Sequence, residues 1–209
     1  MKYRIDLHVH SKFSGDTDSE PEETVLQAVR AGLHGIAFTE HYSYEASAFA
    51  DVLRDRHKGK IMIFRGVEFS SAEGHCLIFG VNTDGLSIKN ASIEDIIPLV
   101  NEKGGVVIPT HPFRGSNSVG DRIKDLKGLC ALEGHNGYAH YFQNAKAVMT
   151  AEELKLPYTG GSDAHLSHEV GACYTEFSHN VTYDNFIDLL RGGDYIGVDT
   201  RKISKVWPF

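Results

Sequence analysis

The chain has 209 residues, which suits one domain, so we expect residues 1–209 to fold as a single unit. Hydrophobic residues make up 41% and charged residues 23%, the profile of a globular chain with one core. The lack of any run of about 18 apolar residues argues against a membrane-spanning helix. The formal net charge of −7 argues against nucleic-acid binding over the whole surface.

The first residues and the three cysteines predict a cytoplasmic protein. Residues 1–6 lack the apolar stretch of a secretory signal. Cys76, Cys130 and Cys173 each lie beside apolar residues and form no CxxC pair. We therefore expect reduced thiols in the core rather than disulfides or zinc thiolates.

Short apolar runs alternate with helix-like stretches along the chain. The pattern predicts, in chain order, a strand at 5–7, a helix from about 19 to 33 with a capping box at its start, a strand at 35–38, a helix at 45–57, a strand at 61–64, a strand at 76–81, a helix from about 92 to 100, strands at 106–108 and 129–132, a helix at 144–154, a strand-like segment at 156–162 and a helix at 182–191. This alternation predicts an α/β fold with a mainly parallel sheet, either open or closed into a barrel.

One segment breaks the alternation. Too few residues separate Glu68 from the apolar run at 76–81 to form a crossover helix. We therefore expect this run to return antiparallel, with His75 at the same end of the sheet as Glu68. A barrel built in this way would be irregular.

Polar residues gather directly after the predicted strands, where the carboxyl ends of parallel strands converge on one site. The chain contains 12 histidines, and histidine is the commonest metal ligand. His8 and His10 are two residues apart, so both face the same way on an extended chain, and the same holds for Asp163 and His165. The other polar residues at strand ends are Glu40, His41, Glu68, His111 and Glu133. Carboxylates packed together without a cation would repel one another, so the pattern predicts a site for several metal ions.

Five short motifs occur in order along essentially the whole chain: DLHVHS at 6–11 followed by SGD at 14–16, TEH at 39–41, GVE at 66–68, THP at 110–112 and GSDAH at 161–165. Together they resemble the motifs of the PHP (polymerase and histidinol phosphatase) family. The resemblance implies a distorted (β/α)7 TIM-like barrel. It also implies a trinuclear metal centre at the carboxyl ends of the strands that hydrolyses phosphoesters.

The resemblance also implies which residues bind the metal ions. The expected ligands form three sets: His8, His10, Glu68 and Asp163; Glu68 as a bridge, with His75 and His111; and Asp16, His41 and His165. Asp18 lies so close to Asp16 that the sequence leaves the choice between them open. Two to three divalent ions are expected, and mixed nitrogen and oxygen ligands suit zinc, manganese or iron.

The expected reaction is attack on phosphorus by a metal-activated hydroxide. Glu68 and Asp163 would hold the ions, and His165 would assist the leaving oxygen. Arg114, three residues after His111, is the main candidate for binding the phosphate.

Several other residues have less specific positions. Lys12 and His168 are further candidates for contact with the substrate. His34 and His57 lie near the ends of predicted helices, where an exposed histidine is common. Glu40 is expected either to point away from the site or to orient His41. Glu133 is expected to lie in the pocket or behind a ligand.

Three functions remain open at this stage. The first is a phosphatase or cyclic-phosphate hydrolase acting on a small metabolite or nucleotide, and the second is a 5′–3′ exonuclease or nucleotidase acting on short nucleic acid. The third is a non-catalytic, metal-bound module that regulates a partner, and the occupied ligand positions argue against it. The negative charge and the lack of an inserted subdomain favour a small phosphorylated substrate. Amidohydrolase chemistry is less favoured because Glu68, rather than a lysine, has the bridging position.

Overall fold

The computed structural model describes residues 2–86 and 91–201. Its strands and helices are β1 (Tyr3–Val9), α1 (Pro21–Arg30), β2 (Gly35–Phe38), α2 (Phe49–Arg56), β3 (Met62–Ser70), β4 (His75–Phe79), α3 (Ile93–Glu102), β5 (Val106–Pro109), β6 (Leu132–Asn136), α4 (Tyr141–Leu154), β7 (Tyr158–Gly161), β8 (Cys173–Phe177), α5 (Phe186–Gly192) and β9 (Tyr195–Asp199). Short 3-10 helices are η1 (Lys12–Ser14), η2 (Glu45–Ser47), η3 (Gly120–Lys124) and η4 (Ser167–Glu169). None of the helices within these ranges is long and apolar enough to cross a membrane.

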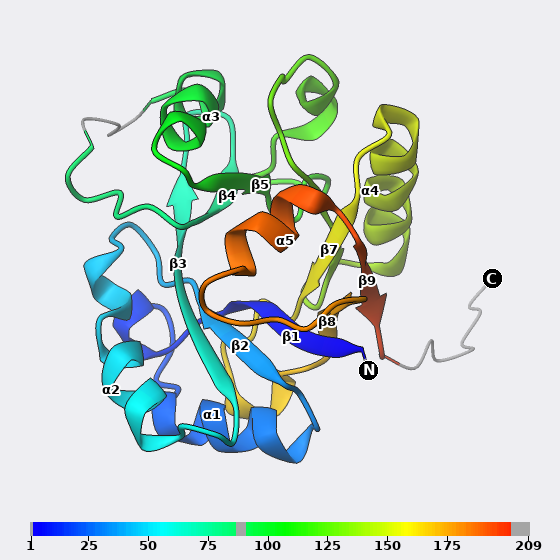
Figure 1. The fold of residues 1–209 in the computed structure, drawn as a ribbon. Coiled ribbons are helices and arrows are strands. Elements are labelled where there is room, and N and C mark those ends of the chain that lie inside the picture. Colours follow the sequence, from blue (N-terminus) through cyan, green and yellow to red (C-terminus); the bar gives the residue numbers. More distant parts are fainter. Residues whose placement is uncertain (1, 87–90, 202–209) are drawn as a thin grey trace.

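The strands form a curled sheet that is open on one side (Figure 1). Its order is β5-β4-β3-β2-β1-β8-β9, and β6 and β7 form a separate parallel pair. β1, β2 and β3 are parallel, whereas β8 and β9 are antiparallel to their neighbours. A bridge between Val9 and Ala164 brings the chain after β7 against the end of β1. This arrangement confirms the distorted TIM-like barrel that the sequence predicts.

The antiparallel return after β3 is also confirmed. β4 pairs antiparallel with β3, with His75 opposite Ser70, and then pairs antiparallel with β5. Because the connection is a tight turn, His75 enters the sheet at the end where β3 finishes. The irregularity of the barrel therefore has a direct effect on which side chains reach Glu68.

Several predicted boundaries are wrong. The strand expected at 61–64 continues to Ser70, so Glu68 lies within β3 and not after it. The strand expected at 129–132 begins only at Leu132 and continues to Asn136. Cys130 and Ala131 pack against a hydrophobic cluster as the chain approaches β6, but they do not pair with a neighbouring strand. Their apolar character therefore reflects packing and not a strand. The helix expected from residue 182 begins at Phe186.

Two elements at the edge of the sheet were not predicted from the sequence. β8 alternates fully buried and half-buried residues, as expected for an antiparallel strand with one covered face. β9 has a similarly mixed burial pattern. Neither resembles the continuous apolar runs of the parallel strands, which explains why the sequence pattern did not reveal them.

The start of α1 also differs from its prediction. Glu20, not Ser19, is the N-cap, and its side chain makes no capping hydrogen bond. Ser19 instead places its hydroxyl 3.2 Å from that of Thr24. Pro21 begins the helix, where its missing N–H has no cost. The predicted capping box is therefore absent.

His57 is buried, not exposed as the sequence suggested. It ends α2 with only 5% of its surface exposed. Its Nε2 lies 2.7 Å from the Glu22 Oε1 of α1. This contact ties α1 to α2, so His57 has a structural position remote from the polar strand ends.

We expect His57→Ala to lower the free energy of unfolding by about 1–3 kcal/mol, because it removes a packed ring together with its hydrogen bond. His179→Ala is the control, since His179 also pairs with a carboxylate, Asp194, but is 64% exposed. Its effect should stay within about 0.5 kcal/mol. Urea unfolding of both variants measures the difference, and equal losses would contradict a structural role for His57.

Candidate metal centre

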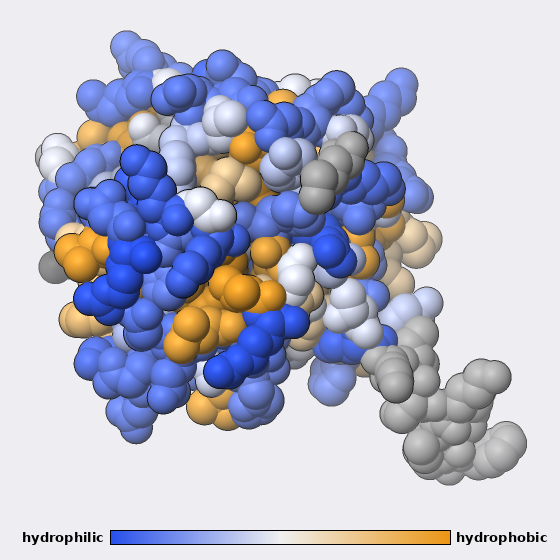
Figure 2. Space-filling model, turned by 60° about the horizontal axis from the view of Figure 1, so that its bottom comes forward, coloured by the Kyte–Doolittle hydropathy of each residue, from blue (hydrophilic) through white to orange (hydrophobic). Residues whose placement is uncertain are grey.

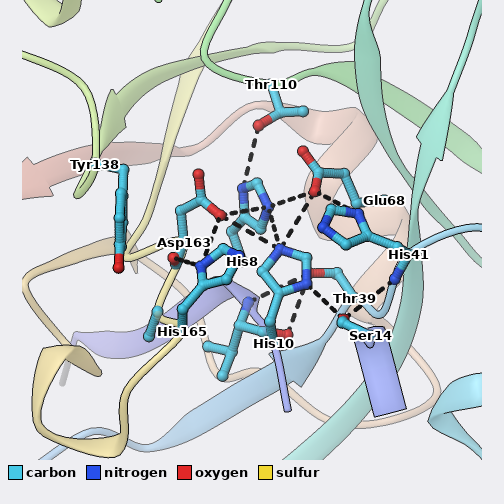
Figure 3. Close-up of polar contacts among 12 residues, drawn as sticks. His8, His10, Ser14, Thr39, His41, Glu68, Thr110, Tyr138, Asp163 and His165 are labelled. Carbon is cyan, nitrogen blue, oxygen red and sulfur yellow. Dashed lines mark hydrogen bonds and ion pairs between the residues drawn. The ribbon is translucent and has the colours of Figure 1, made fainter. Parts of the chain in front are cut away.

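Every residue that the sequence places in a ligand set lies at one end of the barrel. Figure 3 shows six of them: His8, His10, His41, Glu68, Asp163 and His165. The predicted ligands come from β1 and the chain after it (His8, His10, Asp16), the chain after β2 (His41), β3 (Glu68), the start of β4 (His75), the chain after β5 (His111) and the chain after β7 (Asp163, His165). The carboxyl ends of the strands therefore converge as expected.

The first group is fully buried and combines His8, His10, Glu68 and Asp163. The two histidine Nε2 atoms lie 3.1 Å apart. Glu68 Oε2 lies 3.4 Å from His8 Nε2 and 3.2 Å from His10 Nε2. Asp163 Oδ1 lies 3.4 Å and 3.3 Å from the same two nitrogens. Ligands of a tetrahedral zinc ion lie about 3.3–3.6 Å apart, given bonds of about 2.0–2.2 Å. The spacing and the donor types therefore fit a divalent ion.

Glu68 also reaches a second group through its other oxygen. Glu68 Oε1 lies 3.0 Å from His75 Nδ1 and 2.9 Å from His111 Nε2. On the side of the first group, His41 Nδ1 lies 3.1 Å from Glu68 Oε2. Among the described residues, this nitrogen makes no hydrogen bond. Glu68 is thus the residue that the neighbouring groups share.

The third group lies at the rim. Asp16 Oδ2 is 3.0 Å from both His41 Nε2 and His165 Nε2. Of the two aspartates that the sequence left open, Asp16 is the one that contacts these histidines within the described part of the chain. Asp16 as a metal ligand stays a prediction.

The histidines and carboxylates of the first group perturb one another strongly. Burial works against a charge on Glu68, but the histidines around it hold its pKa well below the usual range. Asp163 behaves alike: burial opposes its charge, and His8 and His10 lower its pKa. Burial likewise opposes a charge on His10, but hydrogen bonds to Asp163 and Glu68 raise its pKa to about 9. The pocket thus favours anionic carboxylates that need a positive partner.

A buried carboxylate behind the site holds the imidazole of His8 and the backbone of His111. Glu133 Oε1 lies 2.9 Å from His8 Nδ1, and its Oε2 accepts the backbone N–H of His111 at 2.6 Å. Thr110 and Asn136 donate to the same oxygen at 2.5 and 3.0 Å. Glu133 therefore orients ligands instead of occupying the open pocket.

Glu40 reaches the ring of His10 through Ser14, whereas the sequence offered it as a group that points away or orients His41. The same Ser14 hydroxyl accepts the backbone N–H of His41 at 3.3 Å. The Ser14 hydroxyl donates to Glu40 Oε2 and lies 2.8 Å from His10 Nδ1. Ser11 also donates to Glu40, at 2.6 Å from its hydroxyl. Sequence spacing could not reveal this, because the contact depends on the turn at η1.

The backbone is strained at two of the ligand positions. His111 and Asp163 have φ values of 30° and 56°, in the region that favours glycine. Such conformations cost about 1–3 kcal/mol each and are concentrated at functional sites. Next to Asp163, Gly161 is required for close packing, because a Cβ there would lie 2.4 Å from the Cβ of His8.

The three residues predicted to contact substrate have different positions. Arg114 reaches the centre: its Nη1 donates to Asp163 Oδ2 at 2.6 Å, and its Nη2 lies 3.1 Å from His111 Nε2. Lys12 instead pairs with Glu20 at 2.9 Å on the surface. His168 is exposed on η4, and among the described residues it makes none of the polar contacts that join the site. The structure therefore brings only Arg114 to the centre.

Tyr138 is a site residue that the sequence did not reveal. Its ring lies 5.2 Å from that of His165 (Figure 3). Its hydroxyl donates to Glu169, whose carboxylate also accepts the backbone N–H of His165 at 3.0 Å. Tyr138 comes from the turn after β6 and carries no motif that would mark it.

Comparisons with known proteins agree with this geometry. A family model described as PHP-associated (PHP_C) matches residues 142–195. The uncharacterized protein MJ1587 of Methanocaldococcus jannaschii is 30% identical over 146 residues, which cover 65% of this chain and 82% of that protein. The chain belongs to the PHP-domain family.

Solved structures share the fold at lower sequence identity. A two-domain protein from Bacteroides vulgatus, which contains a predicted PHP-like metal-dependent phosphoesterase, matches with a TM-score of 0.74 and 19% identity, over 95% of this chain and 65% of that one. PsfC from Pseudomonas syringae matches with a TM-score of 0.73 and 21% identity, over 95% of this chain and 92% of that one. This PHP-domain chain thus has the fold of both proteins.

We expect two to three divalent ions per chain in protein purified without chelator, because neighbouring ligand groups share Glu68. Elemental analysis measures this number. Less than one ion in fully folded protein would contradict the site as described.

Glu133→Gln should weaken metal binding about 10- to 100-fold, since it disturbs the group that orients His8 and His111. Calorimetric titration with Mn²⁺ measures the change. Glu152→Gln, an exposed position on α4, is the control with the same chemical substitution. An unchanged affinity in Glu133→Gln would exclude the orienting role.

Proposed function

We propose that this PHP-domain protein is a metal-dependent phosphoesterase that hydrolyses a small phosphorylated substrate. The observation that carries the proposal is the double use of Glu68, whose two oxygens face different groups of histidines. A carboxylate shared in this way is suited to hold two ions close together, and paired ions about 3.5–4 Å apart are typical of phosphatases and nucleases.

The buried histidines and carboxylates would bind the metal ions. His8, His10, Glu68 and Asp163 would hold one ion, and Glu68 would share a second with His75 and His111. Divalent ions in these positions supply positive charge for the phosphoryl oxygens and lower the pKa of water to about 7. Glu133 and the Ser14–Glu40 pair keep the imidazoles aligned throughout.

His165 is the best-placed proton donor for the leaving oxygen. Its Nδ1 lies 2.8 Å from the backbone oxygen of Asp163, so Nε2 is the only ring nitrogen that could donate a proton to the substrate. Nε2 cannot both bind a metal ion and donate a proton. A third ion held by Asp16, His41 and His165 would therefore exclude His165 as the acid, and a two-ion centre would leave it free.

Arg114 supports a phosphate substrate over an amide. A guanidinium has several N–H donors, so contact with Asp163 leaves others for phosphate oxygens. The bridging position is held by Glu68 and not by a carboxylated lysine, which further favours phosphoester chemistry. A short nucleic acid or nucleotide remains a second candidate substrate, because the phosphoryl group is the same.

Glu68→Gln should lower kcat at least about 100-fold, because it removes the charge that neighbouring ions share. The assay is turnover with Mn²⁺ of a panel of phosphomonoesters, cyclic nucleotides and short oligonucleotides. Glu152→Gln should retain the activity of the unmodified chain. A metal-loaded protein that turns over none of these substrates would contradict the proposed function.

Arg114→Ala should raise KM about 10- to 100-fold, the value of a charge-assisted contact to phosphate. Metal affinity should not fall, since Arg114 Nη2 competes for the nitrogen of His111 that an ion would use. Arg114→Lys should recover part of the charge but not the paired hydrogen bonds. Steady-state kinetics and metal analysis of the same samples are the test. An unchanged KM would show that Arg114 does not bind the phosphate and has a purely structural role.

A further inference from the structure

A second cavity lies at the opposite end of the barrel from the metal centre. It has a volume of about 530 Å³ and is bordered by the residues that lead into β1, β2 and β3 and by the loop before α5. This volume is in the range of small-molecule sites, about 300–1,000 Å³. Figure 2 presents the lower side of Figure 1, where β2 and β3 begin, and hydrophobic residues gather in its middle with hydrophilic ones around them.

The floor of this cavity is apolar and its sides are aromatic. Leu33, Ile61 and Val181 are 6%, 5% and 3% exposed, so they form a fixed apolar base. On one side, the rings of Tyr3 and His34 lie 5.1 Å apart.

On the other side, Tyr183 is held in place on the sheet. Its hydroxyl oxygen accepts the backbone N–H of Ile63 at 3.2 Å, which leaves its own hydrogen to donate. The guanidinium of Arg54 lies 4.7 Å from the Tyr183 ring centre and is anchored by a hydrogen bond of 3.0 Å to the Ile63 carbonyl. The Tyr183 ring also packs against Phe64, with 5.2 Å between the ring centres, so a planar group would stack on the guanidinium of Arg54.

The rim of the cavity carries more positive than negative charge. Arg54, Lys58 and Lys60 line it together with one carboxylate, Asp55. Arg54 is already paired with Asp51 at 3.0 Å, so the free positive charge comes from the two lysines. Within the described ranges, Lys58 and Lys60 form no ion pair, and both are exposed. In a chain of net charge −7, this is a local reversal of sign that would attract an anion.

His34 adds a hydrogen-bond donor. Its Nδ1 accepts the backbone N–H of Arg4 at 3.1 Å. Burial and the neighbouring Arg4 lower the pKa of His34, which favours the neutral ring with its hydrogen on Nε2. The cavity thus combines an apolar base, aromatic walls, donors and cations.

We propose that this cavity binds a small molecule that joins a planar aromatic ring to a phosphate, as a nucleoside monophosphate does. The ring would lie against the Tyr3–His34 pair and the guanidinium of Arg54, and the phosphate would face Lys58 and Lys60. This site is independent of the proposed hydrolysis, because it shares no residue with the metal centre.

The test is calorimetric titration with the methylene phosphonate analogue of AMP, in which a carbon replaces the ester oxygen and prevents hydrolysis. The protein is the metal-loaded Arg114→Ala chain, which weakens phosphate binding at the metal centre. We expect saturable binding, and we expect the Lys58→Glu/Lys60→Glu double substitution in the same chain to raise Kd at least about tenfold. The control is Lys103→Glu/Lys127→Glu, which makes the same change of charge at exposed positions elsewhere.

Adenosine and inorganic phosphate, titrated separately, test the two halves of the ligand. Each should bind more weakly than the analogue by at least about tenfold, because each uses only one part of the cavity. The proposal is overturned if the analogue does not bind at millimolar concentration, or if the Lys58→Glu/Lys60→Glu variant binds as well as its control. Phosphate that binds as tightly as the analogue would also overturn it, because the aromatic walls would then contribute nothing.

Discussion

The burial of Glu68 among histidines is the constraint on which the rest of this structure depends. A carboxylate that is 1% exposed needs positive partners, and His8, His10, His41, His75 and His111 all lie within 3.4 Å of its two oxygens. These partners come from four separate segments of the chain, and Glu68 itself lies on a fifth. The barrel must therefore bring five strand ends to one point, and an error in any one of them would leave a buried charge without its partner.

The irregular part of the barrel follows from the same requirement. A regular β/α repeat would place a helix after β3 and carry the next strand away from Glu68. The tight turn and the antiparallel β4 instead return His75 beside Glu68. Strained φ values at His111 and Asp163 have a similar explanation, because they aim side chains inward where an ordinary strand end would continue outward.

The sequence predicted that polar residues meet at one end of the sheet, because most of them follow apolar runs and parallel strand ends must converge; the division into ligand sets came from the resemblance to the PHP family. The sequence left open whether Glu133 lies in the pocket or behind a ligand, and it did not predict the contact of Ser14 with His10, since both contacts depend on distances across the barrel. The prediction that Lys12 contacts the substrate relied on closeness in sequence alone. Lys12 is near His10 in sequence, but the turn of η1 directs it toward Glu20 at the surface.

The two ends of the barrel can support different chemistry because a strand separates its first residues from its last. β1 carries Tyr3 at the cavity and His8 at the metal centre, five residues apart in an extended chain. At about 3.3 Å per residue, this distance is about 16 Å, too far for a side chain at one end to contact a group at the other. A substrate anion must be held by groups within the metal centre itself, and among the residues that the sequence singled out for substrate contact, Arg114 is the one cation that reaches it.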